Sequence, residues 1–174
     1  LMDPQQRMLL EACWEALDGE ACDVRGRVAV LVGISGSEYG RMADGVSAFS
    51  ATGGALSVAC GRLSYVYGLQ GPSVSVDTAC SSSLVGTHLG GAMLARAESP
   101  AALVCGVNVT LLAATSAMFS KAGMLAADGR CKTLDAAADG YARGEGCGVL
   151  RLQGDGGRAV AGACLLVLLG SAVN

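Results

Sequence analysis

The chain has 174 residues and a net charge of −3 at pH 7, and 52% of its residues are hydrophobic while only 4% are aromatic. This length suits one domain, whose core must be built from alanine, valine and leucine rather than from rings. The slight acidic excess and the scattered basic residues argue against a protein that binds nucleic acid or an anionic membrane. With 26 glycines and 3 prolines, the composition is typical of an α/β protein with many tight turns.

The first half of the chain predicts two amphipathic helices and a strand between them. Asp3 and Pro4 provide a cap and a first-turn proline, so a helix is expected to begin here and to run to about residue 17. The elements expected after it are a strand buried on both faces over 28–34, a loop over 35–42 and a helix over 56–67.

The second half predicts strands on either side of a long polar segment. A strand over 73–77 leads into a helix after Cys80, whose apolar stripe includes Leu84, His88 and Leu89. The remaining elements expected are an apolar strand over 101–107, a polar loop over 121–146, and two strands over 146–152 and 159–169 that a turn pairs. Apolar strands that alternate with helices predict a mixed sheet covered by helices on both faces.

The run Ala159–Val173 is the most membrane-like stretch of the sequence, but it is too short to span a bilayer and contains two glycines. We interpret it as a buried strand, so no membrane association is expected. No signal peptide is visible, which makes the cytoplasm the expected location and an organelle the alternative. The first residue is Leu rather than Met, which indicates a piece of a longer protein.

The eight cysteines show neither a CxxC pair nor a Cys–His spacing of the kind that binds zinc. No metal site is therefore predicted. Cys13, Cys60 and Cys105 fall on apolar faces, and a chain without signs of secretion is expected to keep such residues as buried free thiols.

Cys80 differs from the other cysteines because it stands where a strand meets a helix, in SVSVDTACSSSLV (residues 73–85). The unpaired N–H groups and the dipole at a helix N-terminus favour a thiolate, which is the nucleophilic form of cysteine. Thr78 and Ala79 are small enough for a sharp turn, the serines at 81–83 leave room for a ligand, and the Cys80 N–H is a candidate donor to an oxyanion. From position alone, a nucleophile and a structural cysteine are equally good interpretations.

The segment GPSVSVDTACSSSL resembles the active-site region of the β-ketoacyl synthases, the condensing enzymes of fatty acid and polyketide synthesis. MDPQQRMLLEACWEAL, ATGGALSVACGRLSYVYGLQGPS, SKAGMLAADGRCKTLDAAADGYARGEGCGVL and GSAVN are similar to further landmarks of that family, in the same order. The chain resembles the ketosynthase domain of type I polyketide synthases over nearly its whole length. The resemblance implies a thiolase-like fold, layered αβαβα, of which residues 1–174 would be the N-terminal half without its first strand.

This resemblance implies that Cys80 accepts an acyl chain from an acyl carrier protein as a thioester. A malonyl-type extender then loses CO₂, and the resulting carbanion attacks the thioester. No cofactor would be bound directly, since the substrates are carried on the phosphopantetheine of the carrier protein. The implied partners are that carrier protein, other polyketide synthase domains and a second copy of the complete protein. Met118 and Phe119 would line the acyl channel, although plain core packing explains them equally well.

The family's two active-site histidines and a nearby lysine lie in C-terminal motifs that this sequence lacks. The only histidine, His88, is eight residues beyond Cys80 on one helix, roughly 12 Å away at 1.5 Å per residue, and is interpreted as structural. We therefore expect that this chain alone forms no carbon–carbon bond. Asp139, Arg143 and Glu145 are interpreted as loop structure rather than catalytic groups.

Three alternatives remain open. The first is a truncated or partial product that folds against a partner and catalyses no condensation. Thiolases and chalcone-synthase-like enzymes, the second, use a similar cysteine, but DTACSSS together with GRCKTLDAAADGY argues against them. The third, an inactive partner of the chain-length-factor kind, is disfavoured because the cysteine is present.

Overall fold

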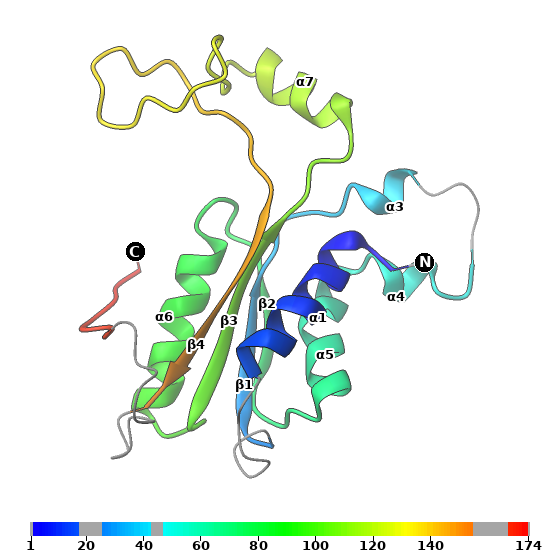
Figure 1. Ribbon diagram of the computed structural model, residues 1–174, viewed down its shortest axis with the longest axis vertical. Coiled ribbons are helices and arrows are strands. Elements are labelled where there is room, and N and C mark those ends of the chain that lie inside the picture. The colour runs from blue at the N-terminus through cyan, green and yellow to red at the C-terminus, as the bar shows by residue number, and fades with distance from the viewer. Residues whose placement is uncertain (1, 18–25, 43–46, 155–166, 174) are drawn as a thin grey trace.

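The computed structural model describes residues 2–17, 26–42, 47–154 and 167–173, and it has the α/β architecture that the sequence predicts (Figure 1). The elements, in chain order, are α1 (Pro4–Leu17), β1 (Val28–Gly33), α3 (Tyr39–Met42), α4 (Ser50–Gly53), α5 (Leu56–Tyr67), β2 (Ser73–Val76), α6 (Ser82–Ala95), β3 (Ala101–Asn108), α7 (Ala113–Lys121) and β4 (Gly146–Gln153).

One mixed sheet organises these elements, with strand order β2-β1-β3-β4. β1 pairs in parallel with both β2 and β3, whereas β4 runs antiparallel to β3. Every residue of β1 is buried, which confirms the prediction of a strand covered on both faces. In the edge strand β2, Ser73 and Val74 are exposed and Val76 is buried, and the alternating serines suit such a position.

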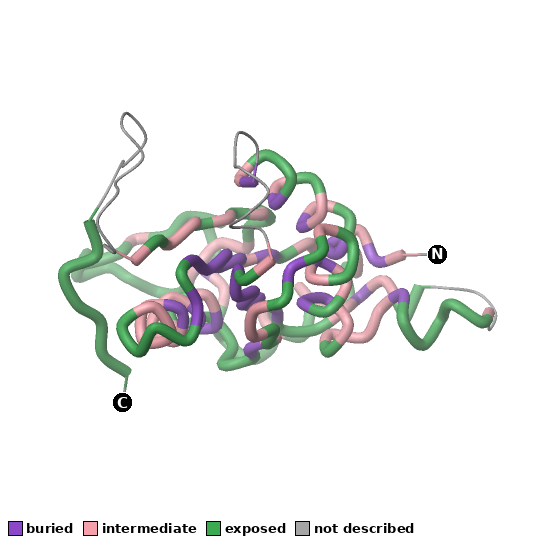
Figure 2. The backbone as a smooth tube through the Cα atoms, turned by 90° about the horizontal axis from the view of Figure 1, so that it is seen from below, coloured by how far each residue is buried: buried purple, intermediate pink, exposed green. Residues whose placement is uncertain are grey.

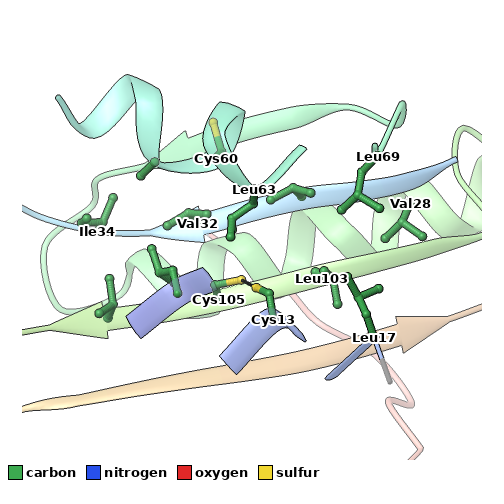
Figure 3. Packing of buried hydrophobic residues seen from close by; sticks show 14 of the residues in the cluster. Cys13, Leu17, Val28, Val32, Ile34, Cys60, Leu63, Leu69, Leu103 and Cys105 are labelled. Carbon is green, nitrogen blue, oxygen red and sulfur yellow. Dashed lines mark hydrogen bonds between the residues drawn. The ribbon is translucent and has the colours of Figure 1, made fainter. Parts of the chain in front are cut away.

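Helices cover both faces of the sheet and divide the core into two clusters. α1 and α5 lie on one face, where Leu9 and Leu63 pack against Val30 and Leu103 (Figures 1 and 3). α6 lies on the other face, over a smaller cluster of four buried strand residues, Ala29, Leu31, Ala102 and Val104. Figure 2 shows the buried residues gathered in the middle of the molecule between these layers. No helix within the described ranges is long and apolar enough to cross a membrane.

Cys13 on α1 and Cys105 on β3 are fully buried, with their sulfur atoms 3.5 Å apart (Figure 3). Their hydrogen bond and the burial of the site raise the pKa of the Cys105 thiol, so it stays protonated. Cys60 is buried as well, and all three are free thiols, as predicted. Cys22 and Cys164 lie outside the described residues.

The predicted apolar stripe of α6 is wrong in part. Leu84 is 71% exposed, and the residues that the helix buries are Ser82, Gly86 and Gly90. A Cβ atom at Gly90 would lie 3.1 Å from Cγ2 of Val104, tighter than normal packing. The helix therefore approaches the sheet along its small residues, and a pattern of large apolar residues cannot identify such a face.

The first turn of α6 rests on two paired glycines at the ends of β1 and β3. Gly33 and Gly106 are partners in the sheet register. A Cβ atom at Gly33 would lie 2.6 Å from the backbone nitrogen of Ser83, and one at Gly106 would lie 3.1 Å from Cβ of Ser83. Any larger residue at these positions would push the start of α6 away from the sheet.

Four expectations differ from the structure. The predicted loop at 35–42 contains the short helix α3, and both α4 and α7 form where no element was predicted. Of the strand predicted over 159–169, residues 159–166 lie outside the described residues, while Val167–Leu169 have no regular structure and are exposed. β4 instead pairs with β3, and within the described ranges no strand adds to its other edge.

The start of α1 is tied to loops that come later in the chain. Oδ1 of Asp3 accepts a 2.8 Å hydrogen bond from the backbone N–H of Gln5, and Oδ2 accepts one from the Ser37 hydroxyl. The backbone N–H of Asp3 donates to the Gly53 carbonyl at 2.8 Å. Asp3 is thus a helix cap, as predicted, and also a buried link between two loops.

We expect Asp3→Ala to lower the free energy of unfolding by about 1–2 kcal/mol, because the cap is lost and the Ser37 hydroxyl loses its acceptor. Asp3→Asn keeps an acceptor for the Gln5 N–H and should lose less. Chemical denaturation followed by circular dichroism measures both values, and equal losses would contradict the capping role.

We expect Gly33→Ala to lower the free energy of unfolding by about 2 kcal/mol, because the new methyl group meets backbone atoms that cannot rotate away. Gly61→Ala on α5 is the matched control. A Cβ atom there meets nothing within 4 Å, and alanine favours a helix over glycine by about 0.5–1 kcal/mol. The two substitutions should therefore shift the unfolding midpoint in opposite directions.

Candidate functional site

The parallel strands bring several chain segments to one edge of the sheet. β1, β2 and β3 run in the same direction, so the segments that follow them emerge at the same edge. These segments carry Glu38 after β1, Cys80 after β2 and α7 after β3. Because β4 is antiparallel, it begins at this edge, and Arg143 and Glu145 stand just before it. Figure 1 shows α7 beyond this end of the sheet.

Cys80 lies on a sharp turn between β2 and α6. The residue before it, Ala79, has a φ of +54°, which is uncommon for a residue other than glycine. Cys80 is exposed and is a free thiol. Within the described part of the chain, no side chain forms a hydrogen bond with its sulfur. The turn therefore presents an unpaired thiol close to the N-terminal end of a 14-residue helix.

Hydrogen bonds from neighbouring side chains hold this turn in place. The Ser82 hydroxyl accepts from the Thr78 N–H at 2.9 Å and donates to the Ala79 carbonyl at 2.6 Å. The Ser81 hydroxyl donates to the Thr78 carbonyl at 2.9 Å, and Oδ1 of Asp77 accepts from the Ala79 N–H at 3.1 Å. Ser81 and Ser82 thus have hydrogen-bonding roles within the turn, which the sequence did not predict.

His88 is half-buried on α6, and its Nδ1 lies 3.0 Å from the hydroxyl oxygen of Ser171. This contact joins α6 to the segment 167–173. The imidazole is engaged away from the Cys80 turn, in agreement with its interpretation as a structural residue.

Met118 and Phe119 lie on α7, at the same edge of the sheet as Cys80, but their environments differ. Met118 is 57% exposed, whereas Phe119 is half-buried beneath Arg143. The central carbon of the Arg143 guanidinium lies 4.9 Å from the centre of the Phe119 ring, a cation–π contact. Of the two residues, Phe119 is therefore the one that the protein holds in a fixed place.

Glu38 is a buried carboxylate that sequence analysis did not single out. Its Oε2 accepts hydrogen bonds from the backbone N–H groups of Leu111 and Leu112 at 2.7 and 2.6 Å, at the start of α7. Its Oε1 lies 3.9 Å from Nη2 of Arg143. Burial opposes ionisation, but the hydrogen bonds led by that of Leu112, together with Arg143, outweigh it and hold the pKa of Glu38 below its ordinary value.

Of the three charged residues considered together in the sequence, Arg143 and Glu145 both contact Thr110, whereas Asp139 has a different partner. Arg143 pairs with Glu38 and donates to the Thr110 hydroxyl at 3.3 Å. Glu145 accepts from the Thr110 backbone N–H at 2.7 Å. Asp139 instead pairs with Lys132, their charged atoms 2.6 Å apart, within the polar loop. These contacts agree with a role in loop structure, although no single network forms.

Among the described residues, no group of three or more His, Cys, Asp or Glu side chains is placed to hold a metal ion.

Glu38 could have been identified in the sequence by its position relative to a strand. A carboxylate that follows a buried parallel strand by a few residues stands at the edge where sites form.

Comparison with known proteins gives the same family from sequence and structure. The chain is 49% identical to the phenolphthiocerol synthesis polyketide synthase type I Pks15/1 of Mycobacterium bovis, covering 99% of this chain and 8% of that protein. It is 47% identical to the polyketide synthase GfsA of Streptomyces halstedii, again over 99% of this chain but 2% of the relative. The chain thus spans only a small part of the curated relatives that it matches.

Solved structures of ketosynthases share the fold. The ketosynthase from module 6 of the bacillaene synthase of Bacillus subtilis 168 has a TM-score of 0.77 and 38% identity, covering 87% of this chain and 27% of that one. A ketosynthase domain from the oxazolomycin system of Streptomyces albus has a TM-score of 0.74 and 28% identity, covering 87% and 28% of the two chains. These matches confirm the thiolase-like α/β fold predicted from the sequence.

The sequence profile of the β-ketoacyl synthase N-terminal domain matches residues 1–155, which is most of the chain. With this match, the polyketide synthase relatives and the ketosynthase structures, we conclude that the chain belongs to the β-ketoacyl synthase family, as the N-terminal part of a polyketide synthase ketosynthase domain.

Proposed function

We propose that Cys80 is the nucleophile that receives an acyl chain from the phosphopantetheine arm of an acyl carrier protein. The observation that carries this proposal is the exposed thiol, without a hydrogen-bond partner among the described residues, on a strained turn close to the start of α6. Family membership supports it, because the segment around Cys80 resembles the active-site region of the β-ketoacyl synthases.

The transfer exchanges one thioester for another. The Cys80 thiolate attacks the carbonyl carbon of the incoming thioester, and the new S–C bond forms as the carbonyl oxygen takes up negative charge. The bond from carbon to the pantetheine sulfur then breaks, and that sulfur leaves as a thiolate that takes up a proton. The N–H of Cys80 is our candidate donor to the oxyanion, since a backbone donor at the nucleophile moves with it.

In the complete protein we infer an acyltransferase of the 3-oxoacyl-[acyl-carrier-protein] synthase type. A malonyl-type extender, also carried on phosphopantetheine, loses CO₂, and the carbanion displaces Cys80 from its thioester to give a β-ketoacyl product. Residues 1–174 would supply the acyl-accepting part of that domain. The partners inferred are a carrier protein, other synthase domains and a second copy of the complete protein, with the cytoplasm as the compartment.

A second candidate function is acyl transfer without condensation. It is favoured by one observation: the chain contains a single histidine, and that residue, on α6, is hydrogen-bonded to Ser171. In the family, two histidines support decarboxylation and the carbanion. We therefore expect no β-ketoacyl product when the 174-residue chain is incubated with acyl and malonyl thioesters of the carrier protein. Mass spectrometry of the released thioesters measures this, and a condensed product would overturn it.

Acylation of Cys80 is tested in a polypeptide that contains the whole ketosynthase domain. After incubation with an acyl thioester, we expect intact-mass and peptide analysis to place the acyl group on Cys80, and Cys80→Ala to abolish the labelling. Cys131→Ala is the matched control, because Cys131 is also an exposed free thiol but lies in the polar loop. It should label like the unaltered protein. Labelling that persists in Cys80→Ala would remove the basis of the proposal.

A further inference from the structure

Two buried thiols from distant parts of the chain meet in the core, on the face of the sheet that α1 and α5 cover (Figure 3). Cys13 lies on α1 and Cys105 on β3, 92 residues apart in sequence. We propose that these two cysteines are a redox site, at which hydrogen peroxide converts the thiols to a disulfide that fastens α1 to the sheet. This inference is independent of the proposed function, because it involves neither Cys80 nor an acyl chain.

The two sulfur atoms are already in direct contact. They lie 3.5 Å apart and share a hydrogen bond. A disulfide bond is about 2.05 Å long, so its formation needs the sulfurs to approach by roughly 1.5 Å. Rotation about the Cα–Cβ bonds moves the sulfurs while the backbone stays in place, so part of this approach leaves α1 and β3 where they are.

The surroundings of the pair come from the described part of the chain. Neither cysteine has any accessible surface, and both belong to the larger core cluster, together with Leu9 and Leu63. Their burial therefore does not depend on the parts of a ketosynthase that lie outside residues 1–174. Reagents reach such a site through local openings of the fold, and hydrogen peroxide, which is close to water in size, needs a small one.

Hydrogen peroxide alone balances the reaction. One sulfur attacks the peroxide, an S–O bond forms as the O–O bond breaks, and the departing hydroxide takes up the thiol proton to become water. The second sulfur then attacks the sulfenic acid, the S–S bond forms as the S–O bond breaks, and a second water leaves with the other thiol proton. Two thiols are thus oxidised to one disulfide, and the peroxide is reduced to two water molecules.

The contact between the thiols determines the product, whereas burial limits the rate. A sulfenic acid that touches a second thiol condenses with it before further peroxide can oxidise it to a sulfinic acid. The reaction is expected to be slow, because the hydrogen bond with Cys13 and burial raise the pKa of Cys105, and the thiolate is the reactive form.

A third thiol packs at the edge of the same cluster and is the competing partner. Cys147 on β4 is half-buried and pairs with Val107, two residues along β3 from Cys105. The sulfur in hydrogen-bond contact with that of Cys105 is nevertheless the sulfur of Cys13. The geometry therefore selects the bond between α1 and β3 over a bond between the two strands.

The test uses a polypeptide that contains the whole ketosynthase domain. Its exposed thiols are first alkylated with iodoacetamide in the native protein, which removes Cys80 as a competitor for the oxidant. The protein is then kept in hydrogen peroxide over a time course, and digested with trypsin and a glutamate-specific protease. Two glutamates lie between Cys13 and Cys22, so the digestion separates these cysteines, and Cys105 falls in a peptide that contains no other cysteine.

We expect mass spectrometry to find peptides 12–15 and 99–121 joined, two hydrogen atoms lighter than their sum, and reduction to separate them. Cys13→Ala and Cys105→Ala should abolish the joined species. Cys60→Ala is the matched control and should leave it unchanged, because Cys60 is buried in the same cluster but its sulfur contacts the Ser57 carbonyl, at 3.7 Å. The bond should also slow hydrogen exchange at the amides of α1 roughly tenfold, because it suppresses openings in which the helix leaves the sheet.

A product that joins Cys105 to Cys147, or a sulfinic acid on Cys13 or Cys105, would overturn the inference. So would a pair that stays reduced while the amides of α1 exchange, because the oxidant then had openings through which to enter. Faster exchange at α1 after cross-linking would also count against it, since the bond would then distort the native packing. Mapping of the unaltered protein gives these answers even if an alanine variant does not fold. Failure of Cys80 to take up an acyl group would overturn the proposed function and leave this inference standing.

Discussion

The close approach of α6 to the centre of the sheet is the constraint on which the site depends. Gly33 and Gly106 form a surface at the ends of β1 and β3 on which Ser83 rests, and Gly86 and Gly90 continue the contact along the helix. A helix that packs through glycine is fixed by backbone contact, with little freedom to slide. The place where α6 begins then determines where the preceding turn stands, and that turn carries Cys80.

The second constraint is electrostatic and acts on the other segments at this edge. Glu38 is buried, but two backbone donors and Arg143 stabilise its charge, so the carboxylate is retained as an anion at the start of α7. The candidate site thus combines two kinds of support. Apolar and glycine packing holds the turn that carries Cys80, while a polar network holds the start of α7, none of whose residues belongs to either core cluster.

Sequence reasoning predicted the elements whose burial follows a regular pattern. β1 and β3 were evident as continuous apolar runs, and α1 and α5 from their helical spacing. It predicted the helix α6 but was wrong in part about its buried face, because the fully buried residues there are serine and glycine while Leu84 is exposed. It missed α7, because that helix buries no complete face and so shows no period. The exposed residues 167–169 were taken for a strand because apolar composition was treated as burial.

The candidate site was predictable only where chemistry is local. Cys80 was singled out from its position between a strand and a helix, together with the family resemblance of the surrounding segment. Arg143 carries no such mark, because it finds its partner only after the chain has folded. The only signal for Glu38 was its position a few residues after the buried strand β1.

The segment between β3 and β4, which contains α7, has both of its ends fixed at the sheet. Residues 109–145 leave the sheet at Asn108 and return at Gly146, and these two residues are paired. The Asn108 amide also donates to the Gly144 carbonyl at 2.6 Å. The two ends of the segment 109–145 are therefore held together at the sheet. Its length and sequence can change while the sheet keeps its register and Cys80 keeps its position.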